Sequence, residues 1–114
     1  MARELVLAEA DGQAVVKITC PSREVADRIA EALVARQAAA CVNILEGITS
    51  VYRWQGEICR DQETLLLVKT VMSKGDAVLA VLQELHPYDV PEAIWTRVAQ
   101  GSKGYLDWMT ESVG

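Results

Sequence analysis

The chain has 114 residues, a formal net charge of −5 and an apolar content of 51%. This length suits one domain with one hydrophobic core. The acidic balance argues against a nucleic-acid partner, because neutralising phosphates requires a basic patch and the basic residues here are scattered singly. No apolar run approaches the roughly 20 residues of a membrane-spanning helix, and the first residues lack the order of a signal peptide. We therefore expect a cytoplasmic protein with no membrane partner.

The first half of the chain predicts a strand, a helix and a long extended segment. Residues 14–19 are β-rich and stop shortly before a proline, which indicates a strand. Ser22 is a good N-cap, and the apolar spacing after it predicts a helix that ends near Ala38. The extended segment 41–54 then runs to a Gln-Gly turn signal at residues 55–56.

The second half predicts the return arm of a hairpin, a second helix, a fourth strand and a final helix. The unbroken apolar run within residues 64–70 suits a central strand that pairs with the preceding segment as a long hairpin. A capping-box-like start at residues 73–76 opens a helix that ends near residue 86. Residues 92–98 indicate a fourth strand, and aromatic residues after the glycine breaks place a short helix at 105–109.

Residues 1–12 allow two arrangements within a single domain that spans 1–114. The turn signal Asp11-Gly12 can fold residues 5–7 back as an extra strand. A loose N-terminal tail is the alternative.

The resulting order, β-α-β-β-α-β-α, is that of the ferredoxin-like fold of the α+β class with an extra C-terminal helix. Right-handed crossovers predict the strand order four, one, three, two, with both main helices on one face. The central hairpin, with about a dozen residues in each arm, is longer than a small sheet of about 5–6-residue strands needs. Its tip is therefore expected to project or to meet a partner chain.

Five short segments between Val15 and Thr110 carry a family pattern. They are Ala-Ala-Cys-Val-Asn-Ile at 39–44, Ser-Val-Tyr-Arg-Trp-Gln-Gly at 50–56, Leu-Val-Lys-Thr at 67–70, His-Pro-Tyr-Asp-Val-Pro-Glu at 86–92 and Gly-Tyr-Leu-Asp-Trp at 104–108. The fourth segment is the most specific, because it looks like a His-Pro-Tyr-x-x-Pro-Glu signature. In this order the segments resemble the CutA divalent-cation tolerance family.

The resemblance implies a ferredoxin-like subunit in a PII-like homotrimer with clefts between subunits. It also implies binding of copper or another divalent metal ion, or of a small ligand, in the response to metal ions or in signalling, and no enzymatic reaction. A structural or scaffolding trimer with incidental metal binding is the alternative. The residues themselves argue against an enzyme, since the chain has one histidine and no nucleophile beside a base.

The predicted metal ligands are Cys20, His86 and Glu92. In the predicted topology the strand and helix ends that carry them meet at one edge of the sheet. Thiolate and imidazole suit copper or zinc, and a carboxylate completes the set. In some family members the proposed cysteine ligand falls at the position of Ile18, about 7 Å away along the same strand face. The structural alternative has His86 held by a backbone carbonyl or by Tyr88, and Glu92 paired with a cation.

A ligand-binding cleft is predicted to involve Glu63, Lys69, Tyr88, Tyr105 and Trp54. Glu63 and Lys69 fall on the central strand, and buried charged groups need partners, so a Lys–Glu pair lining the cleft is expected. The alternative is an ordinary structural ion pair. For Trp54 the alternative role is packing or contact between chains.

Overall fold

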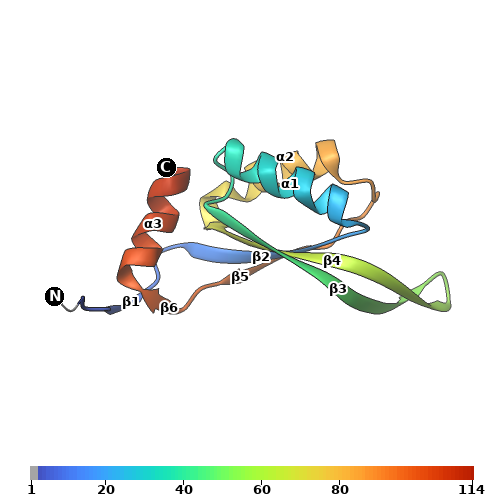
Figure 1. Cartoon of the computed structure of the whole chain (residues 1–114), viewed down its shortest axis with the longest axis horizontal. Helices are drawn as coiled ribbons and strands as arrows, with labels where there is room; N and C mark the ends of the chain where they lie inside the picture. Colours follow the sequence, from blue (N-terminus) through green and yellow to red (C-terminus); the bar gives the residue numbers. More distant parts are fainter. Residues whose placement is uncertain (1–2) are drawn as a thin grey trace.

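The structure, a computed structural model, describes residues 3–114 as a four-stranded antiparallel sheet with a two-stranded ribbon at one end (Figure 1). The strands are β1 (Leu7–Glu9), β2 (Gln13–Cys20), β3 (Cys41–Trp54), β4 (Glu57–Val71), β5 (Ala93–Arg97) and β6 (Gln100–Ser102). The helices are α1 (Arg23–Ala35), the 3₁₀ helix η1 (Met72–Lys74), α2 (Gly75–Leu85) and α3 (Lys103–Val113). Apart from the short elements β1, β6 and η1, this is the predicted ferredoxin-like order.

The main sheet has the strand order β3-β4-β2-β5, which confirms the predicted arrangement. Helices α1 and α2 cover one face of it (Figure 1). Alternate residues of the central strands, such as Ile18 and Leu66, are fully buried against α1 and α2. Each such aliphatic side chain contributes about 1.5–3 kcal/mol through burial. Lys17 of β2 and its partner Ile94 of β5 occupy intervening positions, face away from the helices and are exposed.

The hairpin of β3 and β4 extends well beyond the rest of the sheet (Figure 1). Strand β2 ends where Cys20 pairs with Thr64, so residues 57–63 of β4 pair only with β3. A two-residue turn with positive φ at both Gln55 and Gly56 closes the arm, as the twist of paired strands favours. The molecule measures 55 × 24 × 23 Å as a result. The prediction of a long, projecting hairpin is therefore confirmed.

The N-terminal segment forms a strand, but with a different partner from the predicted hairpin. Strand β1 pairs antiparallel with β6, and Leu7 lies opposite Ser102. The reason is that β2 already lies between β4 and β5 and offers no free edge. Helix α3 packs against the ribbon. The side-chain amide of Gln13, the first residue of β2, donates to the carbonyl of Leu106 over 3.1 Å and to the hydroxyl of Thr110 over 3.0 Å, both on α3.

The helix ends differ in part from their predictions. Ser22 caps α1 as expected, because its Oγ accepts from the N–H of Val25 over 3.2 Å. No side-chain cap forms at the start of α2, where the turn of η1 leads directly into the helix, so the predicted capping box is wrong. Helix α3 begins at Lys103 and therefore includes Gly104, which was expected to lie before it.

The buried hydroxyl of Thr70 provides a test of the core. It donates to the carbonyl oxygen of Ala38 over 2.6 Å. We expect Thr70→Val to lower the free energy of unfolding by about 1–3 kcal/mol, because it removes the donor from a buried carbonyl. The matched change Thr96→Val, at an exposed site of β5, should stay within about 0.5 kcal/mol. Urea denaturation of both variants gives the comparison, and equal effects would contradict it.

Candidate ligand cleft

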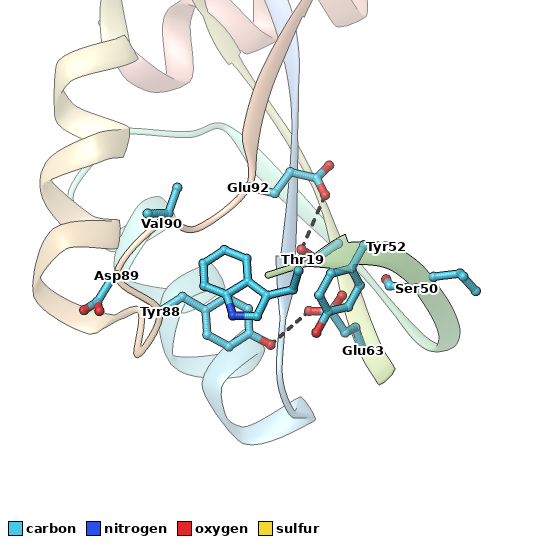
Figure 2. A pocket seen from close by; sticks show the side chains of 10 residues that line it. Thr19, Ser50, Tyr52, Glu63, Tyr88, Asp89, Val90 and Glu92 are labelled. Carbon is cyan, nitrogen blue, oxygen red and sulfur yellow. Dashed lines mark hydrogen bonds between the residues drawn. The ribbon is translucent and has the colours of Figure 1, made fainter. Parts of the chain in front are cut away.

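A cleft of about 620 Å³ lies where the hairpin leaves the sheet (Figure 2). Its walls come from the end of β2, from the hairpin, and from residues 88–92 in the segment that joins α2 to β5. The side chains that give the cleft its chemistry are the aromatic Tyr52, Trp54 and Tyr88 and the acidic Glu63, Asp89 and Glu92. Within the described chain no Lys, Arg or His lines it.

His86 anchors the segment that forms one wall. It directly follows α2, and its side chain is only 8% exposed. Its Nε2 lies 2.8 Å from the carbonyl oxygen of Thr19, and its Nδ1 lies 3.2 Å from the backbone nitrogen of Tyr88. A carbonyl can only accept and an N–H can only donate, so these partners assign the neutral imidazole with its proton on Nε2. Both ring nitrogens are therefore engaged. This agrees with the alternative in which a backbone carbonyl or Tyr88 holds His86.

Tyr88 connects the anchored segment to the hairpin. Its ring lies 4.8 Å from the imidazole of His86, and its hydroxyl donates to Oε2 of Glu63 over 3.0 Å (Figure 2). Burial, followed by the hydrogen bond to Glu63 and its charge, raises the pKa of Tyr88 to about 12. At neutral pH the phenol therefore stays protonated and donates to the carboxylate.

Two further carboxylates of this region, Glu92 and Asp61, also accept from hydroxyl groups. Thr19 donates to Oε1 of Glu92 over 3.5 Å, a long contact that Figure 2 also shows. On the hairpin, Tyr52 donates to Asp61, and this hydrogen bond is the main cause that raises the pKa of Tyr52 to about 12. Both tyrosine hydroxyls are thus neutral donors beside negative charge, and the cleft has a negative potential.

The predicted set Cys20, His86 and Glu92 does not fit a metal ion within one subunit. Residues 3–114 contain no group of three or more His, Cys, Asp or Glu side chains arranged to hold one. Cys20 lies in the core beneath the helices, whereas its neighbour Thr19 contacts Glu92. Neighbouring strand residues point to opposite faces, which the prediction overlooked. Burial, and then the charge of Glu63, raises the pKa of the Cys20 thiol to about 12, so it is not a thiolate at neutral pH.

The predicted ion pair between Lys69 and Glu63 is also absent. Lys69 donates from its ammonium group to the side-chain carbonyl of Asn43 on β3. The two charged residues are six positions apart on β4, which separates them by about 20 Å. Their shared strand places them on the same face but not in contact.

The predicted cleft residues therefore separate into two groups. Glu63, Tyr88 and Trp54 line the cleft together. Lys69 does not, and Tyr105 lies on α3, where its ring is 5.4 Å from that of Trp108. Figure 1 shows that α3 lies at the opposite end of the molecule from the hairpin.

Sequence reasoning missed part of the cleft. Tyr52 was not among the predicted cleft residues, although it shares a strand face with Trp54. The alternation along β3 could have placed these two side chains together. Thr19 gave no such signal, because its contribution depends on how the segment after α2 folds back over β2.

Comparison with known proteins identifies the family. Residues 14–112 match the family model described as CutA1 divalent ion tolerance protein. The chain belongs to this family. It is 53% identical over 100 residues to the divalent-cation tolerance protein CutA of Thermus thermophilus, a match that covers 88% of this chain and 97% of that protein.

Solved structures of CutA proteins have the same fold. The divalent cation tolerance protein of Thermus thermophilus superposes with a TM-score of 0.88 at 52% identity, covering 90% of this chain and 99% of the other. CutA1 of Oryza sativa superposes with a TM-score of 0.87 at 40% identity, covering 90% and 94%. Human CutA is 44% identical over 99 residues, but this match spans 84% of the present chain and only 55% of the human protein.

The family model and the Thermus thermophilus relative are named for tolerance of divalent cations and not for a reaction. In the described part of the chain no helix combines the length and apolar character that crossing a membrane requires.

The link between Tyr88 and Glu63 can be tested by titrating the phenol. In a background with Tyr52→Phe and Tyr105→Phe, the absorbance of the ionised phenol reports the one remaining tyrosine. Glu63→Gln keeps an acceptor but removes the charge, so we expect the pKa of Tyr88 to fall from about 12 toward the ordinary 10. The fall should be partial, because burial is the larger cause.

The matched control is Asp27→Asn, which removes a carboxylate that pairs with Arg23 on α1. It should leave the Tyr88 titration unchanged. An unchanged midpoint in Glu63→Gln would show that the carboxylate does not act on the phenol.

Proposed function

We propose that this protein is a cytoplasmic homotrimer that takes part in the response to divalent cations. In this proposal it binds a cationic ligand, either copper or another divalent metal ion or a small molecule, at clefts between its subunits, and it catalyses no reaction. The observation that carries the proposal is the cleft beside the hairpin, which combines carboxylates with aromatic walls and has no basic residue among the described residues that line it. Membership of a divalent-cation tolerance family supports it.

The projecting hairpin supports assembly. Ile58 is 70% exposed and Trp54 is 58% exposed, and β3 is an edge strand of the sheet. A long edge strand with exposed apolar side chains is a template for pairing with another chain. Strand pairing between three copies would cover this surface and bring a second chain to each cleft.

The metal part of the proposal requires ligands from two chains. Within one subunit both ring nitrogens of His86 are engaged and Cys20 is a buried thiol. The carboxylates of Glu63 and Glu92 remain as metal ligands on the cleft wall, and symmetry can add groups from a neighbouring subunit.

A scaffolding trimer with incidental metal binding is the second candidate. The exposed aromatic side chains of the hairpin favour it, because such residues commonly dominate contacts between chains. A ligand retained by the purified protein would distinguish the first function from this one.

Native mass spectrometry of untagged protein tests the assembly. We expect the mass of three chains at micromolar concentration. Ile58→Asp should weaken the trimer, because it places a charge on the exposed apolar surface of the hairpin. Val34→Asp, at a 44% exposed site on α1, should not. A monomer mass for the unmodified chain would contradict the proposal.

Copper titration by calorimetry tests which residues bind the metal. We expect Glu92→Gln to weaken Cu²⁺ binding by at least about tenfold, since it removes a ligand. Cys20→Ala should change the affinity by less than about twofold, because the thiol lies in the core beneath the helices and not in the cleft. A large loss in Cys20→Ala would contradict this assignment and restore the thiol as a ligand.

A further inference from the structure

The cleft has the dimensions and walls of a small-molecule site. Its volume of about 620 Å³ falls within the range of about 300–1,000 Å³ that is usual for such sites. The rings of Tyr52, Trp54 and Tyr88 supply the apolar surface. Aromatic faces carry negative charge density, and they attract cations that lie over them.

The charges of the cleft also select for a cation. Glu63 accepts from Tyr88 through Oε2, and Glu92 accepts from Thr19 through Oε1. A carboxylate can accept several hydrogen bonds, so each retains capacity for N–H groups of a ligand. The raised pKa values of Tyr52 and Tyr88, to about 12, agree with a negative potential, because Asp61 and Glu63 contribute to both.

The spacing of these groups favours an organic cation over a bare metal ion. A metal ion needs several ligand atoms about 2.0–2.6 Å from one point. The described residues of one subunit provide no group of three or more His, Cys, Asp or Glu side chains that meets this need. An ammonium group needs only hydrogen-bond acceptors and a nearby ring, and its carbon body can occupy the apolar walls.

We propose that the cleft binds an organic ammonium ion that carries an apolar body. The charged nitrogen donates to Glu63, and the body packs against Trp54 and Tyr88. This inference rests on the proposed function in taking the cleft as the ligand site, and it specifies the chemical class of the ligand.

Three probes with the same phenyl body test the charge requirement. They are phenethylammonium, neutral phenylethanol and anionic phenylpropionate, each titrated into the intact protein. Affinity is measured by calorimetry, and the indole N–H resonance of Trp54, assigned by its loss in Trp54→Leu, shows whether each probe binds in the cleft. We expect the ammonium probe to bind about tenfold tighter than the alcohol, and the carboxylate to show no binding.

Variants then locate the recognition. Glu63→Gln should weaken the ammonium probe by about tenfold and leave the alcohol unchanged, since only the charge is lost. Trp54→Leu should weaken both. Asp27→Asn, which lowers the net negative charge of the protein equally but lies on α1, should weaken neither. Thermal unfolding of each variant confirms that it is folded.

Equal affinity for the ammonium and the alcohol, or an equal loss in Asp27→Asn, would overturn the inference. An assembled protein that binds none of the probes would overturn it too, because the cleft would then be closed by a neighbouring copy. The native mass and the copper titration test the proposed function separately. Failure of the probes therefore does not by itself contradict the proposed function.

Discussion

The cleft depends on one buried hydrogen bond, from the imidazole Nε2 of His86 to the backbone carbonyl of Thr19. It fixes the end of α2 to the end of β2, across 67 residues of sequence. The same ring accepts from the N–H of Tyr88 and so sets the course of the next residues. From there the Tyr88 hydroxyl reaches Glu63 on the hairpin. The hydrogen bonds of His86 thus position the wall of the cleft.

This arrangement requires the neutral form of the ring. An imidazolium would direct a second N–H toward the N–H of Tyr88, and two donors repel each other. The most specific motif of the sequence therefore owes part of its pattern to packing. His86 fixes the segment to β2, and Tyr88, two positions later, connects the segment to Glu63 on the hairpin.

The fold could be predicted because its signals are local and repeated. Apolar periodicity defined α1, α2 and the central strands, and the length of the hairpin followed from the distance between its turn signal and its flanking breaks. The site was harder to predict, because it depends on which face of the strand each residue occupies and on how far along the strand it lies. Cys20 and Thr19 are neighbours in sequence, yet one lies in the core and the other contacts Glu92. The pairing of β1 with β6 was equally hard to predict, because it depends on both edges of β2 being occupied by other strands.

The outer part of the hairpin has a consequence for the dynamics of the protein. Beyond the pairing of Cys20 with Thr64, the arm is a two-stranded ribbon without a third strand or a covering helix among the described residues. Such a ribbon is marginally stable in water by itself. Its backbone amides should therefore exchange hydrogen quickly in a dissociated subunit and slowly when another surface covers them. The order of the arm, and with it one wall of the cleft, would then vary with protein concentration, as mass action dictates for any element stabilised by association.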